Sequence, residues 1–243
     1  MNKTMPPRDR LVAALAIVFA IEWTVLAISP NDRAAWVLEN VLVVVAVFAL
    51  AASYRQLRFS WLSYLLIFVF LFIHEIGAYY TYSEVPYDDW FAAVTGQTLN
   101  EILGWERNHF DRAVHFLYGL LLAYPIREIF FRVAAVRGFW SYFLPLDLTA
   151  STSMMFELFE WIAAEIAGGD LGPAYLGTQG DVWDAHKDMA LATTGALIAM
   201  LATAAVNYSF QRDFAREWTE SLRVKRVEPP EQALGRRPKK KKK

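Results

Sequence analysis

Hydrophobic residues in this 243-residue chain are gathered into long blocks that short polar connections separate. Each block is about 20 residues long, the length at which an α-helix crosses the hydrocarbon core of a bilayer. The pattern therefore predicts an all-α, polytopic bundle of six transmembrane helices. We expect these helices at residues 11–29, 34–52, 60–80, 110–131, 140–166 and 182–206.

The connections divide the chain into a short lead (1–10), a membrane domain (11–207) and a charged tail (208–243). The first block is expected to stay as a helix, because its apolar run is long for a signal peptide and no small-x-small cleavage site follows it. The longest internal connection (81–107) is acidic and aromatic, and one short helix at the membrane interface is expected there. Pro145 is expected to break the fifth helix near its start. The tail is expected to be disordered beyond about Glu228.

Composition supports the membrane class. The chain is 56% hydrophobic and only 20% charged, whereas ordinary soluble domains are about 45–50% apolar and about 25% charged. It contains no cysteine, which excludes disulfides, thiolate metal sites and a cysteine nucleophile. We expect the lipid bilayer to be a partner of the chain, and we expect no nucleic acid.

The distribution of lysine and arginine predicts the orientation. Most of these residues lie in the lead, in the second and fourth connections and in the tail, which ends in five consecutive lysines from Lys239 to Lys243. The opposite set holds only Arg33, Arg107, Arg112 and Lys187. Because cytoplasmic loops are enriched in basic residues, we expect both termini in the cytoplasm.

This topology brings acids and histidines from four helices to one level near the extracytoplasmic surface. On the last helix, the spacing i, i+3, i+7 of three aspartates predicts that they share one helical face. A charged side chain at mid-bilayer costs at least roughly 2.5–3.5 kcal/mol on insertion scales, so these groups are expected to face one another rather than lipid. The residues at this level are His74, Asp111, His115, Glu157, Glu160, Asp181, Asp184 and Asp188.

Protons, Arg112, Lys187 and the imidazoles are candidates to neutralise such a cluster, and a divalent metal ion is another. His115 follows Asp111 by one helical turn, and the spacing of Glu157 and Glu160 is used for metal ligands in helical bundles. Aspartate and histidine suit Zn²⁺, Mn²⁺ or Fe²⁺, and a carboxylate-dominated subset suits Mg²⁺ or Ca²⁺. The alternative is a hydrogen-bonded polar network that holds the helices together. The candidate roles are metal ligands (His74, Asp111, His115, Glu157, Asp181 and Asp188), catalytic groups (Glu160 and Asp184) and substrate-binding groups (Arg112, Gln179 and Lys187).

Three neighbouring residues are weaker candidates. His186 falls on the opposite helical face from the aspartates, and His109 points away from Asp111. Glu75 follows His74 by about 100° around the helix, so we rank it below His74.

Four motifs, in order along the chain, carry a resemblance to a known family. They are H-E-I-G-A-Y-Y-T-Y, R-N-H-F-D-R-A-V-H-F with the following Y-G-L-L-L-A-Y-P-I-R-E, F-E-L-F-E-W, and Y-L-G-T-Q-G-D-V-W-D-A-H-K-D-M. Residues 11–207 that contain them resemble the YjdF-like bacterial inner-membrane proteins. The resemblance implies the topology and a place in the inner membrane, but it implies no activity. The second half is similar, more weakly, to VanZ-like membrane proteins, which implies an envelope-related role.

Two classes of function fit these residues. The first is a metal-dependent hydrolase or transferase that acts on a lipid-linked or envelope substrate, with Glu160 as the general base. The second is a cation- or proton-coupled binding or transport protein. Six helices are few for a transporter and no internal repeat is evident; on the other side, the chain lacks a His-x-x-x-His pattern and a serine nucleophile motif. A structural scaffold would leave the buried acids unexplained, and the oligomeric state stays open.

Overall fold

The computed structural model describes residues 7–167, 178–211 and 213–223. All regular elements in these ranges are helices, as the hydrophobic blocks predict. The predicted disordered end of the tail, and most of the lead, lie outside the described residues. The six long helices are α1 (Pro7–Leu26), α2 (Arg33–Ser53), α3 (Trp61–Tyr79), α6 (Phe110–Val133), α7 (Trp140–Ala167) and α9 (Asp184–Phe210).

Four of these helices, α2, α3, α6 and α9, are long and apolar enough to cross a membrane by length and composition. Helices α1 and α7 have similar lengths but are not among these four; their charged side chains include Glu22 in α1 and Glu157 and Glu160 in α7. The predicted helix boundaries agree with the observed ones to within a few residues.

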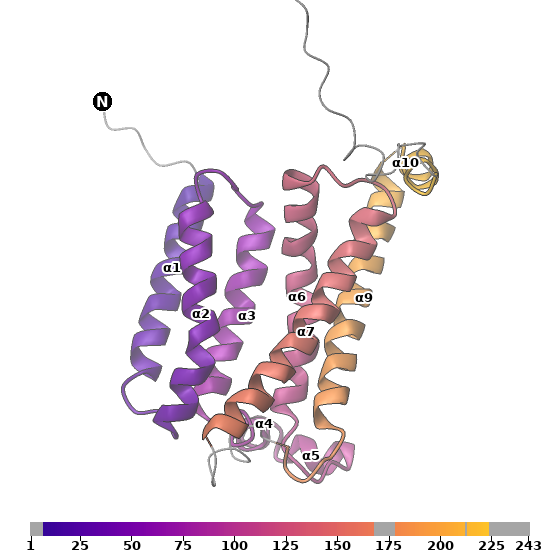
Figure 1. Cartoon of the computed structure of the whole chain (residues 1–243). Coiled ribbons are helices and arrows are strands. Elements are labelled where there is room, and N and C mark those ends of the chain that lie inside the picture. Colours follow the sequence, from indigo (N-terminus) through magenta and orange to yellow (C-terminus); the bar gives the residue numbers. More distant parts are fainter. Residues whose placement is uncertain (1–6, 168–177, 212, 224–243) are drawn as a thin grey trace, which may run out of the picture.

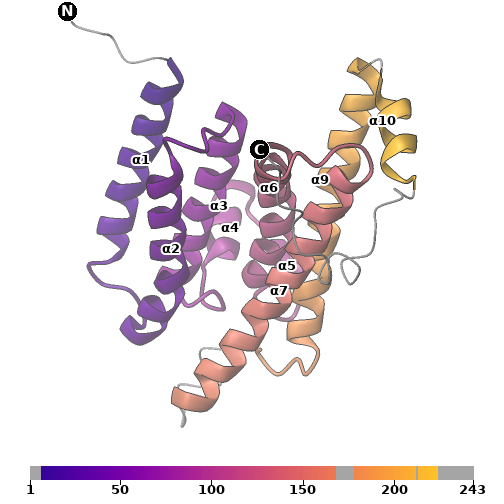
Figure 2. The same ribbon diagram turned by 45° about the horizontal axis from the view of Figure 1, so that its top comes forward.

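The bundle has two groups of helices, α1 to α3 and then α6, α7 and α9 (Figure 1). Helix α6 packs against α9, α7 and α3, while α2 packs against α3. The start of α1 and the end of α9 lie at one end of the bundle, and α4 (Tyr87–Thr95) and α5 (Leu99–Leu103) lie at the other. Turning the molecule shows that α7 runs obliquely along α6 and α9 (Figure 2). The chain thus returns to the end of the bundle from which it started.

The closest helix contact, between α6 and α9, depends on two glycines. A Cβ atom added at Gly119 would overlap the carbonyl oxygen of Ala192, and one added at Gly195 would overlap that of Phe116. Small residues allow such close approach of helix backbones in membrane proteins. Gly119 lies one turn after His115, so this contact also sets the distance between α6 and α9 at the polar end of the bundle.

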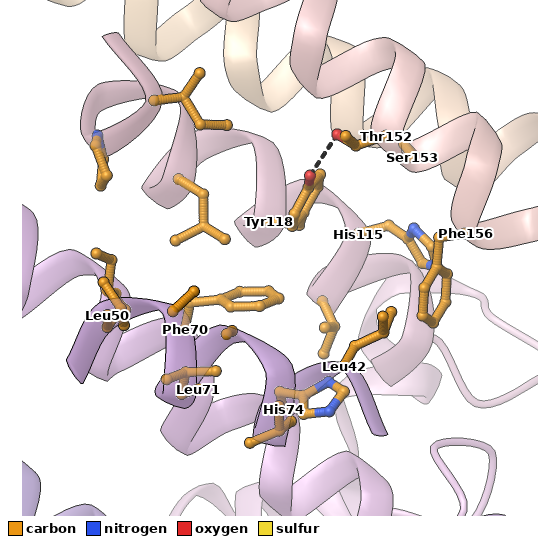
Figure 3. Close-up of a pocket in the computed structure, with 18 of the residues that line it drawn as sticks. Leu42, Leu50, Phe70, Leu71, His74, His115, Tyr118, Thr152, Ser153 and Phe156 are labelled. Atoms are coloured by element: carbon orange, nitrogen blue, oxygen red, sulfur yellow. Dashed lines mark hydrogen bonds between the residues drawn. The ribbon is translucent and has the colours of Figure 1, made fainter. Parts of the chain in front are cut away.

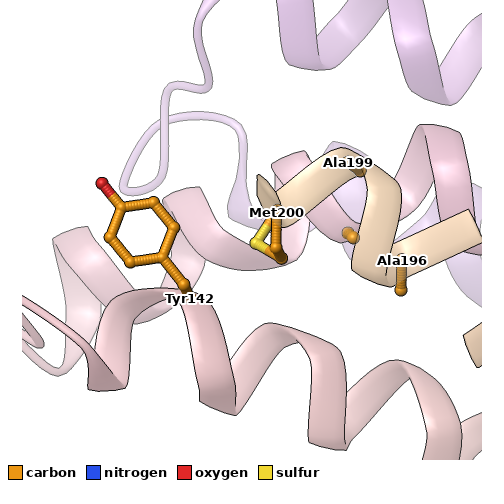
Figure 4. Close-up of a cluster of buried hydrophobic side chains, with 5 residues drawn as sticks. Tyr142, Ala196, Ala199 and Met200 are labelled. Atoms are coloured by element: carbon orange, nitrogen blue, oxygen red, sulfur yellow. The ribbon is translucent and has the colours of Figure 1, made fainter. Parts of the chain in front are cut away.

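Near the opposite end, a small core joins α6, α7 and α9. Ala123, Tyr142, Ala196, Ala199 and Met200 are its buried members (Figure 4). Helix α10 (Phe214–Ser221) covers it, because the Trp218 ring packs against the rings of Phe139 and Tyr142. Helix α10 was not predicted from the charged sequence of the tail.

Two local expectations were wrong. Pro145 does not break its helix, since α7 is continuous from Trp140 to Ala167; a proline this near a helix start removes only one backbone hydrogen bond, and neighbouring helices make such a loss tolerable in membranes. The connection after α3 forms two short helices rather than one. Gly96 and Gly104 end these helices in the left-handed conformation, with φ of 81° and 66°.

Candidate functional site

The side chains that come closest to a metal-ligand arrangement are those of Asp111, His115 and Asp188. One ligand atom from each lies within 4.8 Å of the others. Asp111 and His115 stand one turn apart on α6, and Asp188 faces them from α9. Glu157 of α7 adds a fourth donor, because its Oε1 lies 3.5 Å from His115 Nε2. Three of the helices that the sequence analysis brought together therefore meet here.

Two buried oxygens in this group lack a conventional partner. Asp188 is only 2% exposed, and its Oδ1 makes no hydrogen bond within the described part of the chain. The same is true of Glu157 Oε1. Buried polar atoms are nearly always paired in folded proteins. The donor set of one imidazole and three carboxylates therefore fits a cation.

His74 lies apart from this ligand group, on the opposite side of a shared cavity (Figure 3). Its Nδ1 is hydrogen-bonded to the Tyr82 hydroxyl, while its Nε2 is buried without a partner among the described residues. Thr81 and Tyr82 have positive φ angles of 56° and 55°, and these fold the chain back over α3. A Cβ at Gly77 would lie 2.6 Å from the Tyr82 ring, so the turn requires glycine there. Tyr82 was not among the residues predicted for the site.

Asp184 is held by two arginines instead of facing His115. Its Oδ1 lies 2.7 Å from Arg107 Nη1 and 3.0 Å from Arg112 Nη2, and its Oδ2 accepts a second bond from Arg107, at 3.3 Å. Because Asp184 is 4% exposed, this charge is buried together with its neutralising partners. Arg107 was missed as a site residue, although it is one of the few basic residues on the predicted extracytoplasmic side.

Asp181 does not share a helical face with Asp184 and Asp188, so that expectation was wrong. Helix α9 begins only at Asp184, and a turn precedes it in which Gln179 and Gly180 have φ of 47° and 85°. Asp181 pairs with Arg112 and, at 2.5 Å, with Lys187 Nζ. Lys187 is the main cause that holds the pKa of the Asp181 carboxyl well below its usual range. Asp181 therefore belongs to an ionic cluster next to the ligand group.

Gln179 joins the two loops at this end of the bundle. Its Oε1 accepts a hydrogen bond from the Asn108 backbone N–H at 3.0 Å, and its Nε2 donates to the Asn108 carbonyl at 3.1 Å. Arg107 Nη1 also donates to the carbonyl of Thr178. The two residues named with Gln179 as substrate-binding candidates, Arg112 and Lys187, likewise have partners within the protein.

The predicted base, Glu160, lines the cavity that His74, Asp111 and His115 also line. Four other carboxyl groups lie close enough to interact electrostatically with Glu160, and they belong to Glu39, Asp111, Glu157 and Asp188. Glu160 therefore lies next to the ligand group.

Two further acids are more deeply buried than the sequence suggested. Glu75 is 0% exposed and Glu39 is 6% exposed. Both carboxylate oxygens of Glu75, and Oε2 of Glu39, lack a hydrogen-bond partner in the described ranges. Glu75 was ranked below His74, yet it is the more buried of the two.

The two histidines left out of the site lie at its edge. His186 is exposed and packs against the ring of Trp183. His109 packs against Trp105 with ring centroids 4.3 Å apart, and burial, with Arg112 and Arg107 nearby, lowers its pKa. Neither ring is among the clustered metal-ligand candidates.

Comparison with known proteins covers nearly all of the membrane part. Inner membrane protein YjdF of Escherichia coli (strain K12) is 36% identical over 202 residues, which are 83% of this chain and 91% of that protein. No solved structure matches the chain. Residues 11–208 match the family described as predicted membrane protein (DUF2238), in agreement with the resemblance seen in the four motifs. The chain therefore belongs to the DUF2238 family of predicted membrane proteins.

Proposed function

We propose that all six long helices cross the bacterial inner membrane, with both termini in the cytoplasm. The described chain begins and ends at the same end of the bundle, as an even number of spans requires. Lysine and arginine are concentrated near that end, and cytoplasmic segments carry this excess. The similar Escherichia coli protein is named an inner membrane protein. In this orientation, the polar level lies on the extracytoplasmic side.

We propose that Asp111, His115 and Asp188 bind a divalent cation there, with Glu157 as the fourth ligand. The observation that carries this proposal is the approach of three ligand atoms to within 4.8 Å of one another, in a buried setting. The unpartnered oxygens of Asp188 and Glu157 support it. An imidazole among carboxylates suits Zn²⁺ or Mn²⁺ better than Mg²⁺. Asp181 and His74 are not part of this ligand set, because the first is paired with cations and the second lies across the cavity.

The bound ion would serve a hydrolase or transferase that acts on a lipid-linked or envelope substrate. A metal ion polarises a carbonyl or phosphoryl oxygen and lowers the pKa of bound water. Glu160, which lines the same cavity, would accept a proton as the general base. Asp184, bound to Arg107 and Arg112, would position α9 rather than take part in chemistry.

A cation- or proton-coupled binding or transport protein is the second candidate. The buried acids Glu39 and Glu75 favour it, because unpartnered carboxyl groups continue from the ligand group toward α2 and α3. Chains of such groups are used in proton pathways across membranes. Ion-dependent uptake into proteoliposomes that Glu75→Gln abolishes would favour this candidate over an enzyme.

Metal content tests the shared premise. Protein purified in mild detergent without chelators should hold about one transition-metal ion per chain, as four protein ligands imply. Elemental analysis should show that His115→Ala and Asp188→Asn lose this metal. The exposed His186 supplies a matched control, and His186→Ala should keep it. Wild-type protein without bound metal, or equal loss in the control, would contradict the proposal.

A further inference from the structure

A cavity of about 560 Å³ lies between the two groups of helices. Its walls come from α2, α3, α6 and α7, and Figure 3 shows the side chains of α3 and α6 that face it. Its volume is within the roughly 300–1,000 Å³ of small-molecule sites. The cavity therefore has the size of a ligand site, inside the part of the chain that is expected to lie in the bilayer.

The cavity is long as well as large. On α6 its lining runs from Asp111 to Ile129, and 18 helical positions span about 27 Å at 1.5 Å per residue. That length approaches the roughly 30 Å thickness of the hydrocarbon core. Such a shape suits an extended chain better than a compact molecule.

The chemistry of the lining changes along this length. Leu50, Phe70, Leu71, Leu122 and Ile126 are among the apolar side chains along its length. Tyr118 and Thr152 in this part share a 2.6 Å hydrogen bond (Figure 3), and Ser153 Oγ is a buried hydroxyl without a partner among the described residues. The ionisable groups gather at the other end, where the lining includes His74, Asp111, His115 and Glu160. An occupant would be apolar over most of its length and polar at one tip.

The cavity also reaches the outer surface of the bundle between α2 and α7. Leu42 of α2, and Met155 and Phe159 of α7, line the cavity and are nevertheless 44%, 47% and 52% exposed. Since this surface faces the bilayer in a membrane-spanning bundle, an occupant could enter sideways from the lipid phase.

We propose that this cavity binds the single long hydrocarbon chain of a lipid phosphate, with the phosphate at the Asp111–His115–Asp188 end. This deepens the proposed function and rests on it only for the headgroup, since a cation there would attract the phosphate oxygens that the acids alone would repel. The buried, unpartnered Nε2 of His74 supplies a second group that a phosphate oxygen can bind. The apolar walls recognise the chain by burial alone.

The test is photolabelling of the full chain reconstituted in phosphatidylcholine vesicles. The probe is hexadecyl phosphate with a diazirine at the midpoint of its chain. Peptide mapping should place the label on inner-wall residues such as Leu71 and Leu122, and excess unlabelled hexadecyl phosphate should compete. In Ala46→Trp, labelling should fall by about tenfold, because an indole ring on α2 would fill part of the cavity. Ala49→Trp, at a more exposed lining position, gives a second variant should the first fail to fold.

The matched control is Ala51→Trp on the same helix. Ala51 is exposed and does not line the cavity, so labelling should be unchanged. The proposal would be overturned if Ala46→Trp and Ala51→Trp were labelled equally, or if unlabelled hexadecyl phosphate did not compete. Label found only on outward-facing residues such as Phe48 would also overturn it. His115→Ala should lose the metal and be labelled more weakly on the inner wall, because the phosphate loses the cation that attracts it. Metal bound to wild-type protein without inner-wall labelling would overturn this proposal alone, whereas inner-wall labelling of wild-type protein that holds no metal would overturn the cation site alone.

Discussion

The two groups of helices differ in how their polar and apolar contacts are satisfied. In the group of α6, α7 and α9, glycines bring backbones into contact, and the buried Asp184 is bound by two arginines. In the group of α1, α2 and α3, the buried Glu39 and Glu75 leave oxygens without a partner, and α2 packs chiefly on α3. The first group therefore fixes the geometry of the proposed ligands, and the second forms the looser wall of the cavity.

Ionisable side chains are buried in two different ways in this molecule. Around Asp184, each charge has a counter-charge at hydrogen-bond distance, so removing one partner would leave the other buried without compensation. Around Glu75, no described counter-charge is at hand, and keeping an unpaired polar group buried is costly. Groups retained at such a cost are typically functional in membrane proteins.

The largest expected effect is on the glycine contact. Gly195→Leu would force a side chain into the Phe116 carbonyl group. Because helix backbone moves less easily than a side chain, the free energy of unfolding should fall by about 3 kcal/mol or more. Thermal unfolding in detergent measures this. Leu201→Ala, at a position that is 61% exposed on the same helix, should have little effect; a similar loss there would show that α9 is not specially sensitive at Gly195.

Metal removal should give the next largest effect. When the concentration of free ion is about a hundred times its dissociation constant, binding stabilises the folded chain by about 2.7 kcal/mol. A chelator should therefore lower the unfolding temperature of the wild type. It should leave that of Asp188→Asn unchanged, and an equal decrease in both proteins would place the ion elsewhere.

Breaking the arginine pair should have an intermediate effect. Removing one partner of a buried ion pair typically costs about 3–5 kcal/mol, but Arg112 would still bind Asp184 after Arg107→Met, so we expect a loss of about 2 kcal/mol. Arg33→Met is the comparison, since its contacts to the carbonyls of Ala27 and Ile28 are exposed. Equal losses of unfolding free energy in the two variants would show that the Arg107–Asp184 pair adds no specific stability to the group of α6, α7 and α9.

The sequence predicted the fold better than the site, for physical reasons. Long apolar blocks can satisfy their backbone groups in a membrane only as helices or closed barrels, so the positions of the six long helices followed from hydrophobicity. The pairing of Asp184 with Arg107 did not follow, because Arg107 lies in a loop that is 77 residues away along the chain. The left-handed turn at Gln179 and Gly180, which takes Asp181 off the helix face, depends on two backbone angles that spacing alone does not reveal.

The grouping of Asp111, His115 and Glu157 could be predicted because helical periodicity and membrane depth together fix where such side chains lie. The separation of His74 from them could not, since it depends on the fold-back of Tyr82 over Gly77. Contacts that arise from loops therefore mark the limit of inference from helical pattern.

The smallest expected effect has the opposite sign and tests the looser group directly. Glu75→Gln keeps the shape of the side chain and removes an ionisable group from a site that is 0% exposed. Replacing a buried, unpaired ionisable group relieves its desolvation penalty, so the free energy of unfolding should stay level or rise by about 1 kcal/mol. Asp184→Asn, in the group of α6, α7 and α9, should lower the free energy of unfolding. Thermal unfolding of the two variants side by side measures the contrast. A clear loss of stability in Glu75→Gln would mean that the carboxylate has a bound cation or another counter-charge after all, and α1 to α3 would then hold a second ion-binding position rather than an unsatisfied acid.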